Sequence, residues 1–295
     1  MVFTLFQGDP FTNFGFYDSI ELGLYMVIVG YFFLIFAYFL IMRFRISKKS
    51  YWFFFSLLFI ALAASRVFFI IYDFYIPEID NPSVTTDDEF VVATFMIIFR
   101  FATFSTWMAT TCLMGMLGIL LLPPDTKFEK KPIKETDNKI LSFFYENMRY
   151  VKYLLRFLLM LCPIILSILA FTLPEGVFIE KSIIDNYSTS ITPVYVNIAG
   201  WEYPVGRFVF NFIFQPLFVA IIPFIFLYLA WKTFGVLRRS YLLNGIGFLI
   251  YYVGRIVRGL FEVINWPNVQ SFVPPLLILL SLLLIVIANS FEALR

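Results

Sequence analysis

The sequence predicts an all-α, multi-pass membrane protein with seven transmembrane helices. Hydrophobic residues make up 61% of the 295 residues and charged residues only 14%, whereas a soluble domain has about 45–50% apolar and about 25% charged residues. Seven separate segments also reach the roughly 20 mostly apolar residues that a helix needs to cross a bilayer. We therefore expect residues 1–295 to form one seven-helix membrane domain.

The predicted spans follow one another along the whole chain. They cover residues 22–42, 52–72, 90–122, 153–173, 207–231, 241–262 and 272–289. The third is longer than a bilayer requires, so it is expected to be tilted or to protrude from the membrane. Prolines lie within the fourth and fifth spans, at Pro163, Pro216 and Pro223. Prolines inside a helix are expected to kink it.

Loop charges predict the orientation. Lysine and arginine gather in the loops after the first, third and fifth spans, whereas the opposite loops are mainly acidic. Basic residues collect on the cytoplasmic side of short loops, so we expect the N-terminus outside, the C-terminus in the cytoplasm and the protein in the cell membrane. Residues 123–152 are expected to form a cytoplasmic linker followed by a helix at the membrane interface. An ordinary solvated loop is the alternative for this segment.

Two segments of the sequence resemble each other. The tetrapeptides KKSY and RRSY each precede an apolar stretch with an arginine and, seven residues later, an acidic residue: Arg66 with Asp73, and Arg255 with Glu262. This pattern favours a parallel repeat of 3+1+3 architecture, with the fourth span as connector, as in some membrane transporters. The alternative is that cytoplasmic helix starts are commonly basic and aromatic.

Arginines inside the predicted spans are the strongest functional signal. A charge at the bilayer centre costs about 2.5–3.5 kcal/mol on insertion scales, so such residues face the bundle interior, find partners or reach the interface. At about 1.5 Å per residue, Arg66 lies about 22 Å from the inner end of its helix, and Arg255 lies at nearly the same level. Arg100 enters from the other side, and Arg258 and Arg207 lie higher. We expect these five arginines to crowd the outer half of the membrane.

This crowding predicts a cationic ligand-binding cavity that is open to the outside. The candidate residues are Arg66, Arg100, Arg255, Arg258, Asp73 and Glu262. Arginine binds carboxylate or phosphate through two parallel hydrogen bonds, so an anionic small molecule or a lipid headgroup is the expected ligand. Arg258 and Glu262 have the spacing of a local pair, whereas Arg66 and Asp73 each need a partner from another helix. The alternative is a set of structural ion pairs between helices.

Other polar residues in the spans have simpler expectations. Arg156, near the inner end of the fourth span, is expected to extend to lipid phosphates. Asn211, Gln215 and Asn244 are expected to join helices by hydrogen bonds.

Several chemistries are not expected. The chain has no histidine, which excludes histidine metal ligands and histidine-activated nucleophiles. Cys112 and Cys162 lie in apolar runs and do not indicate a disulfide framework. There is no glycine-rich phosphate loop, metal-ligand cluster or nucleophile motif, so we expect neither an enzyme nor a bound cofactor or metal. The net charge of +2 suggests no nucleic-acid partner.

The predicted plan is similar in outline to three groups of membrane proteins. It resembles rhodopsins and G-protein-coupled receptors, but the seventh span has no lysine for retinal and no NPxxY motif, and the third does not end in DRY. The 3+1+3 plan resembles SWEET and PQ-loop transporters, although Gln215-Pro216 reverses the order of their motif. Seven-span sensory modules that precede histidine kinases have a similar outline. These likenesses concern architecture alone.

Three functional interpretations follow. The preferred one is a receptor-like or sensory protein that binds an anionic ligand through Arg66, Arg100 and Arg255. Because no signalling domain follows the last span, it would act through a separate cytoplasmic partner, for which the basic inner segment is a docking surface. The second is a secondary transporter or lipid-handling protein, which the repeat and the proline-rich fifth span favour. The third is a structural subunit of a membrane complex. Membrane lipids are partners in all three.

Overall fold

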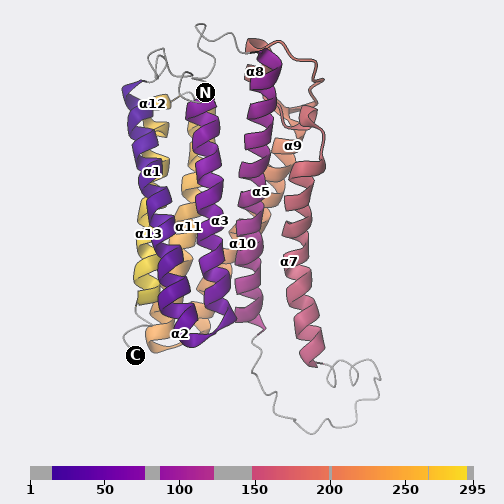
Figure 1. Ribbon diagram of the computed structural model, residues 1–295. Helices are drawn as coiled ribbons and strands as arrows, with labels where there is room; N and C mark the ends of the chain where they lie inside the picture. The colour runs from indigo at the N-terminus through magenta and orange to yellow at the C-terminus, as the bar shows by residue number, and fades with distance from the viewer. Residues whose placement is uncertain (1–14, 77–86, 123–147, 199–200, 265, 291–295) are drawn as a thin grey trace, which may run out of the picture.

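Most of the chain is helical. The computed structural model describes residues 15–76, 87–122, 148–198, 201–264 and 266–290. Within these residues, seven helices are long and apolar enough to cross a membrane, and they lie side by side in a bundle (Figure 1). The predicted helical class and the seven spans are thereby confirmed, whereas the orientation and the repeat stay predictions.

The first three spans contain two π-helical segments. They are built from α1 (Phe16–Ala37), η1 (Tyr38–Phe44) and α2 (Arg45–Ser47), then α3 (Ser50–Ile70) and η2 (Ile71–Tyr75), then α5 (Asp88–Leu121), with η1 and η2 π-helical. Lys48, with a φ of 54°, turns the chain between the first two spans. π-Helical turns are rare in proteins, and those that occur are often found at functional sites.

The last four spans include a third π-helical segment. They are α7 (Met148–Thr172), then α9 (Val205–Phe208), the π-helical η4 (Val209–Phe214) and α10 (Gln215–Lys232), then α11 (Gly235–Ile264), and, after the short α12 (Pro267–Gln270), α13 (Val273–Ser290). Gly235, with a φ of 66°, makes the turn from α10 into α11. The helices continue through Pro163 and Pro223, and Pro216 lies in the first turn of α10.

Side chains near the helix starts extend the spans beyond the apolar runs. Asp18 accepts a hydrogen bond from the backbone N–H of Gly15 at 2.9 Å, and α1 therefore begins at Phe16, six residues before the predicted span. Asp87 caps α5 in the usual manner of an N-cap carboxylate, accepting from the N–H of Glu89 at 3.3 Å. Both helices therefore begin before the apolar runs that predicted them.

A small cap follows α7 at the end of the bundle opposite α2 (Figure 1). It contains the 3₁₀ turn η3 (Glu175–Val177), the helix α8 (Lys181–Asn186) and an antiparallel hairpin of β1 (Tyr195–Ile198) and β2 (Trp201–Pro204). The N–H of Val194 donates to the carbonyl of Gly176 at 2.8 Å. A Cβ atom on Gly176 would lie only 2.1 Å from the carbonyl oxygen of Thr192, so only glycine fits there.

The spans pack against one another in a defined order. α3 packs between α1 and α5, α5 also packs against α7, α11 packs against α10 and α13, and α1 contacts α13. One apolar core lies among α1, α3, α10, α11, α13 and the end of α5. Stacked aromatic rings contribute to it, with Phe39 5.4 Å from Trp52 and 4.6 Å from Phe55. A second core joins α5 and α7 to the cap.

Polar side chains join three spans at the α2 end. Asn289 of α13 donates to the side-chain oxygen of Asn244 of α11 at 3.0 Å, and Arg43 of η1 donates to the backbone carbonyl of Asn289 at 2.6 Å. Asn244 thus links helices as the sequence led us to expect. α13 ends at this end of the bundle, whereas α1 begins at the opposite one (Figure 1). The predicted linker and most of the predicted interfacial helix, residues 123–147, lie outside the described residues.

Candidate functional site

Four of the six predicted site residues lie near one another, three of them around one tyrosine. Arg66 of α3 stacks over the ring of Tyr25, with its guanidinium carbon 4.0 Å from the ring centroid, and Arg258 of α11 lies 5.4 Å from the same centroid. Asp73 of η2 pairs with Arg258 at 2.7 Å, and Arg255 lies within electrostatic range of both other arginines. We call Arg66, Arg255, Arg258, Asp73, Glu21 and Tyr25 the arginine cluster.

Glu21 and Tyr25 were not among the predicted site residues. Tyr25 is fully buried and Glu21 is 7% exposed. One carboxylate oxygen of Glu21 lies 3.8 Å from Arg258, and the other accepts a hydrogen bond from Ser271 at 3.1 Å. The sequence placed Glu21 one residue outside the first span and grouped it with the acidic outer loops. The Asp18 cap is the signal that would have extended the helix far enough to include it.

Arg255 is held by neutral groups. With its amide oxygen facing the guanidinium, Gln215 of α10 accepts hydrogen bonds from both terminal nitrogens of Arg255, one of them at 2.9 Å. Tyr251 also accepts a hydrogen bond from Arg255. Gln215 therefore joins helices as expected, and it does so by binding a charge.

The positive charge of the cluster is only partly matched. Asp73 and Glu21 both face Arg258. In the part of the chain that the structure describes, no ion pair joins Arg66 or Arg255 to a carboxylate. The predicted pair of Arg258 with Glu262 cannot be compared, because the Glu262 side chain lies outside the described part. Among the described side chains, the cluster holds three guanidinium groups and two carboxylates.

Arg100 lies apart from this cluster. It donates to the carbonyls of Phe171 and Leu173 at the end of α7, both at 2.9 Å, and lies 3.7 Å from Glu175. The last carbonyls of a helix have no partner within that helix, so the arginine caps α7. An open hollow of about 570 Å³ lies beside it. The predicted depths of the arginines suggested that all of them line one cavity. In the structure, Arg100 contacts the end of α7, whereas Arg66 contacts Tyr25 of α1.

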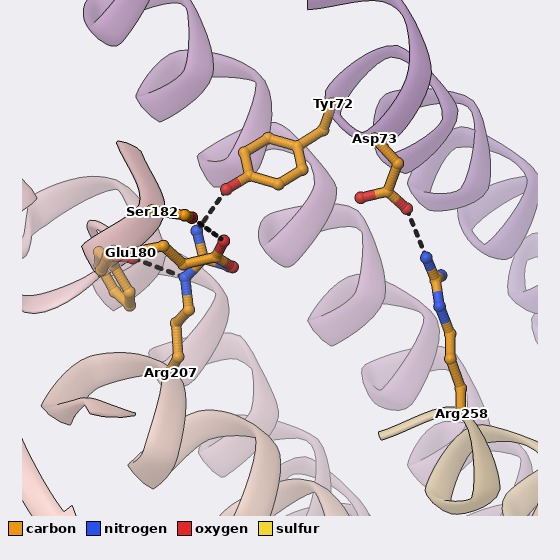
Figure 2. A network of polar contacts seen from close by, with 7 residues as sticks. Tyr72, Asp73, Glu180, Ser182, Arg207 and Arg258 are labelled. Carbon is orange, nitrogen blue, oxygen red and sulfur yellow. Dashed lines mark hydrogen bonds and ion pairs between the residues drawn. The ribbon is translucent and has the colours of Figure 1, made fainter. Parts of the chain in front are cut away.

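Arg207 forms a second network. It donates to the carbonyl of Phe178 at 2.5 Å and to the hydroxyl of Tyr72 at 2.7 Å, and it pairs with Glu180. Figure 2 shows Arg207 and Arg258 reaching the adjacent residues Tyr72 and Asp73 from different helices. The π-helical η2 thus connects the Arg207 network to the arginine cluster.

Arg156 corrects one expectation. Instead of extending to lipid phosphates, it donates to the carbonyl of Leu122 at the end of α5. Gly118 leaves room for this contact, since a Cβ there would lie 3.2 Å from Cγ of Arg156. The reason is again the unpaired carbonyls of a helix end, which are costly without water. Arg100 and Arg156 thus cap the C-terminal ends of each other's helices.

The fold defines a multi-pass helical membrane protein with a partly compensated arginine cluster between its helices. No model of a known protein family, no curated protein and no solved structure matches this chain. Any function must therefore be argued from the cluster itself.

Proposed function

We propose that this protein is a receptor-like or sensory membrane protein whose arginine cluster binds an anionic small molecule or a lipid headgroup. One observation carries the proposal: among the described residues, Arg66 and Arg255 have no carboxylate partner inside the bundle. A charge in this position is costly unless a partner compensates it. A bound carboxylate or phosphate would supply that compensation through bidentate hydrogen bonds.

The cluster is partly exposed and its residues are positioned in advance. The side chains of Arg258 and Asp73 are 27% and 25% exposed. Gln215 fixes Arg255 from α10, and the ring of Tyr25 supports Arg66. Groups fixed before binding lose less conformational entropy when a ligand arrives.

The cluster also joins several helices, which suits a receptor. Its side chains come from α1, α3, η2 and α11, and Gln215 of α10 contacts it through Arg255. A ligand that draws Arg66 and Arg255 together would favour one arrangement of α3 relative to α11, and a ligand shifts an equilibrium only through such differential contacts. A cytoplasmic partner that binds the inner basic segment would then sense the change. This proposal requires no catalysis.

A transporter is the second candidate, and one observation favours it. Near its start the fifth span contains the π-helical η4, and α10 follows it with Pro216 in its first turn and Pro223 about two turns later. Irregular helices of this kind line substrate sites in transporters. Gln215, at the start of α10, contacts the cluster through Arg255.

Ligand binding tests the proposal. The purified protein in phosphatidylcholine nanodiscs is titrated with phosphate, acetate and succinate while its thermal unfolding midpoint is recorded, because a ligand that binds the folded state raises the midpoint. At least one anion is expected to raise it, and Arg66→Gln or Arg255→Gln is expected to weaken that effect roughly tenfold or more, as for a lost charge-assisted hydrogen bond. Arg43→Gln, at the opposite end of the bundle, is the matched control.

Two outcomes would separate the candidates. Uptake of the active anion into proteoliposomes that is lost in Arg66→Gln would favour the transporter. Binding without uptake would favour the receptor. If no anion shifts the midpoint, or if Arg43→Gln abolishes the shift as fully as Arg66→Gln does, the ligand site fails and the structural-subunit interpretation takes its place.

A further inference from the structure

Two buried polar atoms of α1 have no hydrogen-bond partner among the described residues. They are one carboxylate oxygen of Glu21, Oε1, and the hydroxyl of Tyr25. The two residues are four apart on one helix, so their side chains lie on the same face. Buried polar atoms are nearly always hydrogen-bonded, and a pair of exceptions at one place indicates a missing water, ion or ligand.

The Glu21 carboxylate is fixed with one oxygen left over. Ser271 donates to Oε2 at 3.1 Å, and Oε1 lies 3.8 Å from Arg258, beyond hydrogen-bond length. Asp73 already takes the close contact with the same arginine nitrogen at 2.7 Å. Oε1 is therefore a buried acceptor that lacks a donor, and the donor that an ionised carboxylate binds most strongly is a cationic N–H group.

The other side of Tyr25 offers the complementary chemistry. Arg66 covers the tyrosine ring, and Arg66, Arg258, Glu21 and Asp73 all lie within electrostatic range of its phenol. Arg66 and Arg255 supply donors without a carboxylate among the described residues. The arginine cluster thus combines an acceptor that lacks a donor with cations that lack an anion among the described residues.

We infer that the cluster binds a zwitterion, with a primary ammonium group on Glu21 and an acidic group on Arg66 and Arg255. This inference rests on the proposed function and specifies the ligand class. The Tyr25 hydroxyl, which has no hydrogen-bond partner among the described residues, is available to bond to either group. Two sources share this chemistry: a free α-amino acid, with its carboxylate, and the phosphatidylethanolamine headgroup, with its phosphate. Both carry their two charges only a few bonds apart.

Three small probes test the amine. Glycine, acetate and methylammonium chloride are added to the protein in phosphatidylcholine nanodiscs, and the unfolding midpoint is followed. Glycine is expected to bind at least tenfold more tightly than acetate, which lacks the ammonium group, because a charge-assisted hydrogen bond has about that effect on affinity. Glu21→Gln is expected to remove the preference for glycine while acetate binding remains. Glu180→Gln, which alters the carboxylate beside Arg207, is the matched control and is expected to keep the preference.

A lipid source is tested by changing the nanodisc. If the headgroup is the ligand, phosphatidylethanolamine is expected to raise the unfolding midpoint relative to phosphatidylcholine, because the quaternary ammonium of phosphatidylcholine has no N–H. Phosphatidylethanolamine is then also expected to compete with glycine. Ser271→Ala keeps every charge but frees Glu21, so it is expected to weaken the preference for glycine even where Glu21→Gln does not fold.

The results separate this inference from the function beneath it. Equal affinity for glycine and acetate, or a preference that survives in folded Glu21→Gln, overturns the zwitterion and leaves anion binding in place. Stabilisation by none of the three probes, in either lipid, overturns the zwitterion, and the phosphate and succinate titrations then decide whether anion binding stands.

Discussion

An arginine in this bundle is defined by the group that accepts its hydrogen bonds. One kind binds the backbone carbonyls at helix ends, another pairs with carboxylates, and the third has neither partner among the described residues. The three kinds are Arg43, Arg100 and Arg156; Arg207 and Arg258; and Arg66 and Arg255. Each of the first two kinds has a structural role that its contacts explain. Only the third leaves a charge for a ligand.

The contacts of Arg207 predict a strong effect on stability. Arg207→Met would leave the Phe178 carbonyl and the Tyr72 hydroxyl without their donor, and both residues are buried. Each buried group left unsatisfied costs about 1–3 kcal/mol. We expect a clear fall in the denaturant midpoint of the purified protein, measured by circular dichroism.

The matched control is a salt bridge at the surface of the same cap. Lys181 and Glu202 pair at 2.7 Å, but their side chains are 58% and 48% exposed. Exposed pairs contribute little because solvent screens them. Lys181→Met is expected to leave the midpoint unchanged. Equal shifts for the two variants would show that the Arg207 network does not stabilise the fold.

The residue scale is also where the sequence was least informative. Helical rise predicted that Arg66 and Arg100 both lie in the outer half of the membrane, and this stays a prediction. Their functions differ because Arg66 faces α1 and Arg100 faces α7, and only tertiary packing decides which neighbour a side chain faces. Asp73 was correctly expected to need a partner from another helix, and it finds Arg258 of α11.

At the scale of helices, the sequence predicted much more. All seven spans were located because twenty apolar residues in succession have few alternatives. The boundaries moved outward where polar side chains extend the helices, as Asp18 does for α1. The π-helical segments were not predicted, since their irregular hydrogen bonds leave no periodic signal in a continuously apolar run.

Reciprocal capping of α5 and α7 gives a prediction at this scale. Arg156→Ala removes the donor from the end of α5, and Arg100→Ala removes it from the end of α7. We expect each substitution to loosen the other helix: amide exchange should rise at residues 118–122 in the first variant and at residues 169–173 in the second. A cost of about 1–3 kcal/mol corresponds to an increase of roughly fivefold to a hundredfold.

The residues at which amide exchange becomes faster decide this test. Hydrogen–deuterium exchange with mass spectrometry of peptides from both helices provides the measurement. If the faster exchange is confined to the turn that carries the substitution, the arginines do not stabilise the neighbouring helix. Ser56→Ala, which removes a hydrogen bond made only within α3, serves as the control because it should alter neither helix end.

At the scale of the whole molecule, the arrangement explains why the site joins helices that are distant in sequence. α1 lies beside α13 and α3 lies beside α5, while α10 and α11 pack together. Glu21 and Ser271 therefore meet across nearly the full length of the chain. A pattern of apolar spans does not encode such pairings, which is why the cluster of cations was predictable while Glu21, Tyr25 and Gln215 as its partners were not.

The orientation of this arrangement gives the last prediction. Ser47 ends α2 and Ser190 follows α8, and both residues are exposed. α2 and α8 lie at opposite ends of the bundle (Figure 1), and the basic loops predict that Ser47 lies in the cytoplasm. With Cys112 and Cys162 replaced by alanine, Ser190→Cys is expected to react with a membrane-impermeant maleimide on intact cells. Ser47→Cys is expected to react only after permeabilisation. The reverse pattern would put the arginine cluster near the inner surface, where a cytoplasmic metabolite rather than an external one would reach it. Labelling of both on intact cells would contradict the seven-span arrangement, because two ends of one bundle cannot face the same compartment.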